Sequence, residues 1–179
     1  MKYGAFLRGI NLGARRRVAS ADLRSSFEAM GFEDVGTFRT SGNVVFRAAP
    51  RSSGMNRRIE TALTRTLGFE VSVFLRTEKE MRAIAKHRPF SRKLVNSSDG
   101  KLQVALLSVK PAQRLRKEVL ALAGDDDRLA FGVRELYWLP SGGTRDSALD
   151  YREIEELLGP TTRRTKETLD KMVEKYFAD

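Results

Sequence analysis

The segment Leu7-Arg8-Gly9-Ile10-Asn11-Leu12-Gly13 follows directly on an apolar run that begins at Tyr3. A second segment, Ser41-Gly42-Asn43-Val44-Val45-Phe46, opens with a polar turn and continues as an apolar run. Each joins a turn-forming cluster to a predicted β-strand. Between them, residues 20–30 have the apolar spacing of a helix, and Gly31 stands where such a helix ends. With a further strand over residues 35–40, the order of elements is strand, helix, strand, strand.

The same pattern continues outward from this region. Residues 55–67 predict a second helix and residues 71–76 a fourth strand, which gives the β-α-β-β-α-β order of a ferredoxin-like unit. A capping box opens a further helix over residues 77–87, and the polar, turn-rich residues 91–101 predict a linker. The order β-α-β-β then recurs from residue 102, with no recognisable last strand before the C-terminal helices.

The predicted fold class is therefore α+β, with two ferredoxin-like halves in tandem, the second incomplete and finished by C-terminal helices. The predicted division is a first half over 1–76, a connecting helix and linker over 77–101, and a second α+β half over 102–179.

The topology predicts where the two polar segments lie. In a ferredoxin-like sheet the first two strands run parallel and the third lies between them in the opposite direction, so the end of the first strand meets the hairpin of the next two. Glycine-rich turns with asparagine and arginine suit an anion, because backbone N–H groups and guanidinium groups both donate to it. The candidate anion-binding residues at this edge are Arg8, Asn11, Arg15, Arg16, Arg17, Ser41 and Asn43.

A purely structural interpretation of these residues stays open. Glycine and asparagine are what tight turns need without any ligand, and asparagine side chains often bond their own loops. Arg8 can likewise pair with Asp22 or Glu28 on the following helix.

Charge is distributed unevenly along the chain. Residues 1–90 carry 17 Lys or Arg and 8 Asp or Glu, for a net +9, whereas residues 91–179 carry 16 and 15, for +1. A basic half beside a neutral half favours an anionic partner, although a merely solubilising basic surface has the same composition.

The chain has no cysteine, which excludes disulfides and thiolate chemistry. No apolar run is long enough to span a membrane, and we expect a cytoplasmic protein.

Other motifs carry weaker signals. His87, the one histidine, stands near a predicted helix end, where it is expected to interact with terminal carbonyls instead of acting in catalysis. The run Asp125-Asp126-Asp127 predicts a solvated acidic turn, and no metal or cofactor is expected. Phe6 and Phe46 are expected in the core instead of on an open RNA-binding face, and one of Tyr137 and Trp138 is expected in the core.

The two opening segments, together with Leu75-Arg76-Thr77 and Pro89-Phe90, resemble the bacterial family called domain of unknown function 1697. The resemblance covers most of the chain and implies an α+β protein with two ferredoxin-like halves. It implies no activity. Such proteins usually show Thr-Arg-Asn-Trp before the C-terminal helix, and this chain has Thr162-Arg163-Arg164-Thr165 instead.

Three functions remain open on this basis. The first is a non-catalytic protein that binds nucleic acid or a phosphorylated ligand through the basic edge. The second is an enzyme acting on a small anionic substrate at the same edge, for which no general base is evident. The third is a structural or protein-interaction module.

Overall fold

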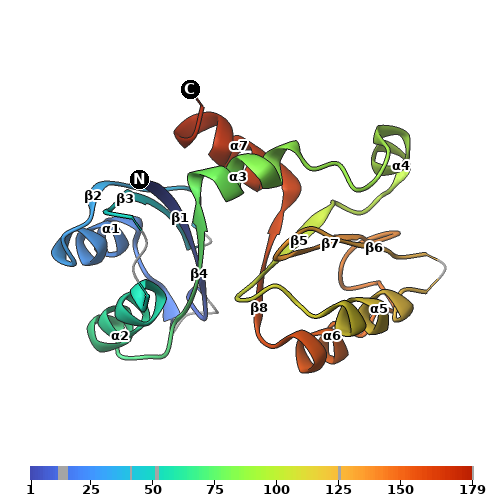
Figure 1. The fold of residues 1–179 in the computed structure, drawn as a ribbon, viewed down its shortest axis with the longest axis horizontal. Coiled ribbons are helices and arrows are strands. Elements are labelled where there is room, and N and C mark those ends of the chain that lie inside the picture. The colour runs from blue at the N-terminus through green and yellow to red at the C-terminus, as the bar shows by residue number, and fades with distance from the viewer. Residues whose placement is uncertain (12–15, 41, 51–52, 125, 179) are drawn as a thin grey trace. The chain divides into compact units, whose positions relative to one another are not determined.

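The computed structural model describes residues 1–11, 16–40, 42–50, 53–124 and 126–178 (Figure 1). The chain folds as two compact units, unit 1 with residues 1–82 and 172–179 and unit 2 with residues 83–171. Two helices, α3 (Glu78–Lys86) and α7 (Lys166–Tyr176), each run from one unit into the other. Among the described residues, no helix is both long and apolar enough to cross a membrane.

Unit 1 contains one four-stranded antiparallel sheet in the order β2-β3-β1-β4. Its elements are β1 (Lys2–Arg8), α1 (Ser20–Ala29), β2 (Glu33–Thr37), β3 (Asn43–Arg47), α2 (Met55–Leu67) and β4 (Ser72–Thr77). The strand β1 pairs with β3 on one side and with β4 on the other, as the predicted ferredoxin-like topology requires. Helices α1 and α2 lie on the same face of this sheet (Figure 1).

The core of unit 1 forms between these two helices and the sheet. Alternate strand residues point toward the helices, which is the two-residue period of a strand, and α2 contributes residues at the four-residue spacing of one helix face. Phe46 lies wholly buried against Phe27 and Phe32, with ring centres 5.4 and 4.4 Å away. The strand and α2 residues of this core include Tyr3, Ala5, Leu7, Val44, Val73, Leu75, Met55, Ile59 and Leu63.

The opposite face of the sheet is buried as well. Phe6 and Phe74 pair across β1 and β4, and neither is more than 2% exposed. A Cβ atom on Gly4 would lie 3.2 Å from the Met81 sulfur of α3, so this helix packs directly on the sheet. Tyr176, at the end of α7, donates a 3.0 Å hydrogen bond to the Thr37 carbonyl of β2. The expectation that Phe6 and Phe46 are core residues is confirmed.

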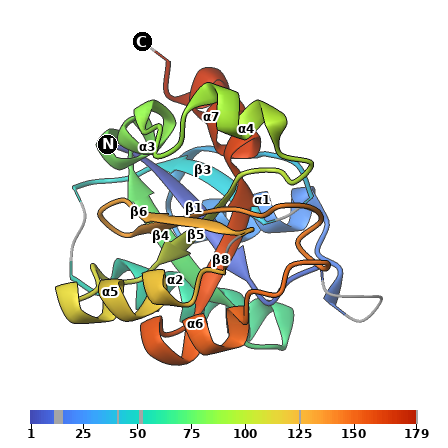
Figure 2. The same ribbon diagram turned by 90° about the vertical axis from the view of Figure 1, so that its right-hand side faces the viewer.

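Unit 2 repeats the sheet topology, in the order β6-β7-β5-β8. Its elements are α4 (Arg92–Ser97), β5 (Gln103–Leu107), α5 (Gln113–Ala121), β6 (Arg128–Phe131), β7 (Glu135–Leu139), α6 (Tyr151–Leu158) and β8 (Thr161–Thr165). Helices α5 and α6 lie side by side on one face of this sheet in both views (Figures 1 and 2). Tyr137 and Trp138 are both buried, on opposite faces of β7.

The expectation of an incomplete second half is wrong. Strand β8 pairs with β5 along its whole length, from Thr161 opposite Leu107 to Thr165 opposite Gln103, and it completes a full β-α-β-β-α-β unit. Its sequence, Thr-Thr-Arg-Arg-Thr, contains no apolar residue, so hydropathy alternation gives no strand signal there.

The fourth strands of the two units end in the same way. Arg76-Thr77 ends β4 and Arg164-Thr165 ends β8. The hydroxyl of each threonine accepts the backbone N–H three residues later, at 3.3 Å for Thr77 and 3.2 Å for Thr165, and thereby caps the helix that follows. Both arginines are buried, and each donates to the carbonyl of the residue before it. This repetition supports the predicted duplication.

Hydrogen exchange tests the last strand. We expect alternate backbone amides of residues 161–165 to exchange much more slowly than those of the exposed loop 141–145, because an edge strand bonds alternate amides to its neighbour. The measurement is amide exchange by NMR under native conditions. Uniformly fast exchange across residues 161–165 would contradict the assignment of β8.

Candidate functional site

The end of β1 and the hairpin between β2 and β3 meet at one edge of the unit 1 sheet, as predicted. The Leu7 backbone N–H donates a 2.8 Å hydrogen bond to the Gly42 carbonyl, just beyond the pair formed by Phe6 and Asn43. The hairpin itself is closed by the Phe38 N–H, which donates to the Asn43 carbonyl at 3.0 Å. Arg8 and Asn43 therefore lie in one neighbourhood.

Asn11 joins the loop after β1 to this hairpin. Its side-chain nitrogen donates to the Thr40 carbonyl, and its side-chain oxygen accepts the Val18 N–H at 3.0 Å. Its own N–H donates to the Arg16 carbonyl at 2.6 Å. Asn11 has a φ of 56°, a left-handed conformation that asparagine tolerates better than most residues. The side chain thus holds both ends of its own loop and the neighbouring turn.

Asn43 has a similar role inside the hairpin. Its side chain is wholly buried, and its nitrogen donates a 2.9 Å bond to the Phe38 carbonyl. A buried amide needs such partners, because an unpaired polar group is costly away from water. The two asparagines of the predicted site are therefore structural braces of the edge.

Gly42 permits the close approach of the two loops. It has a φ of +70°, and a Cβ atom there would lie 2.7 Å from Ile10 Cδ1 and 3.1 Å from Leu7 Cβ. Both the conformation and the contact require the absence of a side chain. The polar segments are brought together by this backbone contact.

The cationic residues of the edge differ in exposure. Arg8 is partly buried and has further contacts within the protein, whereas Arg16 and Arg17 are exposed. The Arg16 guanidinium carbon lies 5.3 Å from the centre of the Phe69 ring, a cation–π arrangement. Within the described chain, Arg17 has no hydrogen bond or ion pair. Arg15 and Ser41 lie outside the described residues.

Neither carboxylate of α1 is buried at this edge. Asp22 and Glu28, on α1, are both exposed to solvent. Among the described residues, no three His, Asp or Glu side chains converge as a metal site.

One acidic residue of unit 2 was predicted wrongly. Asp127 is only 4% exposed, not solvated, and its carboxylate accepts the Trp138 indole N–H at 2.6 Å and the Ser147 hydroxyl at 2.8 Å. Asp126 is exposed and Asp125 lies outside the described residues. The buried indole needs an acceptor, and a run of three identical residues does not reveal which one supplies it.

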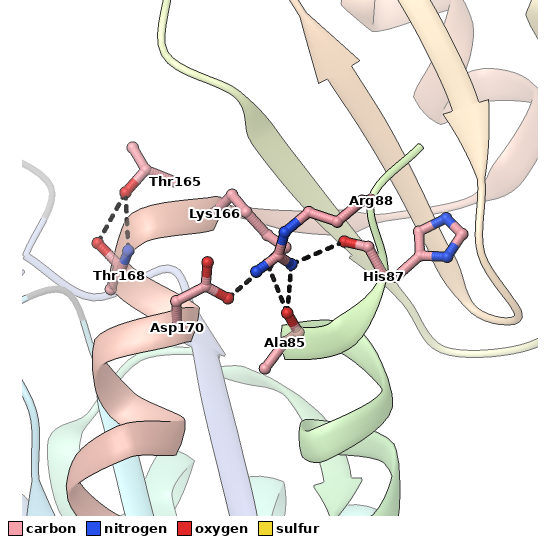
Figure 3. Close-up of polar contacts among 7 residues, drawn as sticks. All are labelled: Ala85, His87, Arg88, Thr165, Lys166, Thr168 and Asp170. Atoms are coloured by element: carbon pink, nitrogen blue, oxygen red, sulfur yellow. Dashed lines mark hydrogen bonds and ion pairs between the residues drawn. The ribbon is translucent and has the colours of Figure 1, made fainter. Parts of the chain in front are cut away.

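His87 does not cap the end of α3 with its side chain. Its ring lies 4.7 Å from that of Tyr137 and points away from the carbonyl of Ala85 (Figure 3). Arg88 and Lys166 donate to the Ala85 carbonyl instead, the latter at 3.1 Å. Two cations therefore stabilise the negative end of this helix.

The burial of three cations, Arg76, Arg164 and Lys166, was missed at the sequence level. Lys166 is 6% exposed and also pairs with Asp170 one turn along α7 (Figure 3). Burial lowers the pKa of Lys166, and the bond to Asp170 opposes that effect. Burial also lowers the pKa of Arg164 to about 10. Arg164 donates to the Thr162 hydroxyl at 2.9 Å, so both Lys166 and Arg164 are engaged within the protein.

We expect loss of the two asparagine side chains to destabilise the protein unequally. Asn43→Ala removes a buried amide and should lower the free energy of unfolding by about 2 kcal/mol, whereas Asn11→Ala, which is partly exposed, should lower it by about 1 kcal/mol. Urea denaturation measures both. The exposed Asn96 provides a control, since Asn96→Ala should change little. Equal effects at positions 43 and 96 would contradict the bracing role.

Gly42→Ala should lower the free energy of unfolding by about 2 kcal/mol, because it combines a left-handed backbone with a contact that Ile10 must relieve. Gly142→Ala is the matched control, since a Cβ atom there meets nothing within 4 Å. Urea midpoints of the two variants give the comparison. A stable Gly42→Ala protein would show that the two loops are not held in close contact.

Comparison with known proteins agrees with this architecture. A conserved bacterial protein of solved structure, SP0830 from Streptococcus pneumoniae, is 21% identical, with a TM-score of 0.76 over 97% of this chain and 98% of that one. At this identity the likeness concerns the fold alone. No curated protein shows significant similarity to the chain. The model of one family, described as a protein of unknown function, matches residues 1–137. This chain therefore belongs to the DUF1697 family.

Proposed function

We propose that this chain binds an anionic partner without catalysis, through the edge formed by the end of β1 and the β2–β3 hairpin. Nucleic acid is the favoured partner, ahead of a phosphorylated small molecule. The observation that carries the proposal is the exposure of Arg16 and Arg17 on a loop whose backbone is braced by Asn11.

The bracing favours binding because it reduces the entropy lost when a ligand is captured. The Arg16 carbonyl accepts the Asn11 N–H, and the next residue but one, Val18, donates to the Asn11 side chain. These two hydrogen bonds restrain the backbone of residues 16–18, to which the side chains of Arg16 and Arg17 are attached. A positioned group loses less freedom on binding than a group on an unrestrained loop.

The environment of Arg16 also suits a phosphate. When a guanidinium lies over an aromatic ring such as Phe69, its N–H groups remain available in its own plane. Phosphate oxygens accept two such N–H groups at once. The net charge of +9 on residues 1–90 adds a longer-range attraction that speeds association.

Salt dependence of binding tests the proposal. We expect binding to single-stranded RNA or DNA oligonucleotides to weaken steeply with salt, and the Arg16→Gln/Arg17→Gln variant to reduce the slope of log K against log salt by about 1.4, which is about 0.7 per lost phosphate contact. Fluorescence anisotropy across a salt series provides the slopes.

The matched control removes two exposed arginines from unit 2, as Arg92→Gln/Arg145→Gln, and should leave the slope unchanged. Identical slopes for the unmodified protein and the Arg16/Arg17 variant, or binding that is micromolar or weaker and unaffected by the substitutions, would overturn the proposal. Binding of inorganic pyrophosphate with no binding of oligonucleotides would favour the phosphorylated small molecule.

A further inference from the structure

A hollow of about 550 Å³ lies beside α2 in unit 1, on the helical side of the sheet. It is bounded by Met30 after the C-terminal end of α1, by Gly54 before α2, and by one face of α2 itself. The α2 residues that line it are Arg57, Arg58, Thr61, Ala62 and Arg65. Three of these five residues are arginines, and no carboxylate is among the lining residues.

The arginines of the hollow differ in how they are held. Arg58 donates to the Met30 carbonyl, and its guanidinium carbon lies 5.2 Å from the centre of the Phe32 ring. Arg57 and Arg65 are exposed, and neither side chain has a hydrogen bond or ion pair within the described chain. One anchored and two available guanidinium groups therefore surround the hollow.

Three other helices each pair one exposed cation with a carboxylate four residues away. Arg114 pairs with Glu118 on α5, Arg152 with Glu156 on α6, and Lys171 with Glu167 on α7, at 2.6 to 3.3 Å. Such pairs at a spacing of four residues stabilise a helix by a few tenths of a kcal/mol each.

Helix α2 lacks this arrangement along the hollow. The residue four positions after Arg57 is Thr61, and the residue four positions after Thr61 is Arg65. Glu60, the one carboxylate of the helix, accepts the Val73 N–H at 2.8 Å and is thereby directed to β4. Among the described residues, the side chains of Arg57 and Arg65 thus have no anionic partner, and an external anion would stabilise their charges.

The spacing along α2 suits a chain of phosphates. Arg57, Thr61 and Arg65 follow one another on a single row, about 6 Å apart at each step. The threonine hydroxyl between the two arginines is a further possible donor. A nucleic-acid strand presents one phosphate per nucleotide along its length, so each side chain of the row can meet a phosphate of the same strand.

The hollow follows α2 from Gly54 to Arg65, and the edge described above lies beyond the C-terminal end of this helix. Helix α2 ends at Leu67. The ring of Phe69, two residues later, makes the cation–π contact with the Arg16 guanidinium. The helix has 13 residues and is about 20 Å long, the length of about six nucleotides of a stacked strand. One strand of that length can therefore contact both regions.

We propose that the α2 hollow binds the phosphate backbone of a nucleic acid, as a second contact region for the strand held at the Arg16–Arg17 edge. The proposal rests on the proposed function, since it assigns further contacts to the same ligand. It identifies Arg57 and Arg65 as phosphate-binding residues and Arg58 as the anchored arginine of the site.

The test compares Arg57→Gln/Arg65→Gln with the Arg16→Gln/Arg17→Gln and Arg92→Gln/Arg145→Gln variants. With single-stranded oligonucleotides, the α2 variant should lose about 1.4 from the slope of log K against log salt and bind about tenfold more weakly, or worse, at about 50 mM salt. Circular dichroism and urea unfolding establish that the variants are folded. Loss of slope in the Arg16/Arg17 variant alone would overturn the α2 site and leave the edge intact. Absence of binding by the unmodified protein would overturn both.

Cross-linking gives a second readout that does not depend on charge. Because the chain has no cysteine, Thr61→Cys places a single thiol in the hollow, and a photoreactive group attached there should cross-link to a bound oligonucleotide. Thr144→Cys, on an exposed loop of unit 2, is the control and should give little cross-linking. Equal yields at the two positions would overturn the proposal, and competition by inorganic pyrophosphate without competition by unlabelled oligonucleotide would assign the hollow to a small phosphorylated ligand.

Discussion

The hydrogen bond from Leu7 to Gly42 is the constraint on which the rest of the candidate site depends. It joins the last residues of a central strand to a hairpin that lies more than thirty positions later in the sequence. Once that contact is made, Asn11 reaches the hairpin turn, and the loop that carries Arg16 is held at both ends. The chemistry of the edge thus follows from a backbone approach that only glycine allows at position 42.

The second unit has a corresponding backbone hydrogen bond, but the arginines around it have other roles. There the Leu107 N–H donates to the Arg134 carbonyl at 2.9 Å, again between the end of a central strand and the following hairpin. Arg134 donates to the Ser108 carbonyl, and Arg116 donates to the carbonyls of Gly132 and Val133. These arginines brace the β6–β7 hairpin and the end of β5, whereas Arg16 and Arg17 in unit 1 remain exposed. A duplicated fold thus combines a structural edge in one copy with a basic edge in the other.

Much of the architecture could be predicted from the sequence, because its signals are local. The apolar runs of β1 and β3 and the four-residue spacing of α2 directly reflect burial on one or two faces. The meeting of Arg8 and Asn43 followed from topology alone. The bracing roles of Asn11 and Asn43 could not be assigned in advance, since an asparagine that bonds its own loop and one that awaits a ligand have the same sequence context. Strand β8 was missed because its buried side chains are threonine and arginine, so the strand shows no alternation of apolar and polar residues.

The path of the C-terminal helix has a consequence for folding during synthesis. Residues 172–178 belong to unit 1, although they are made only after all of unit 2. Tyr176 accepts a 3.0 Å bond from Lys2 through its carbonyl and lies against Gly36, while Phe177 is 1% exposed. During synthesis, the unit 1 sheet therefore emerges from the ribosome before α7, and the part of its surface that α7 covers stays exposed until that helix has been made.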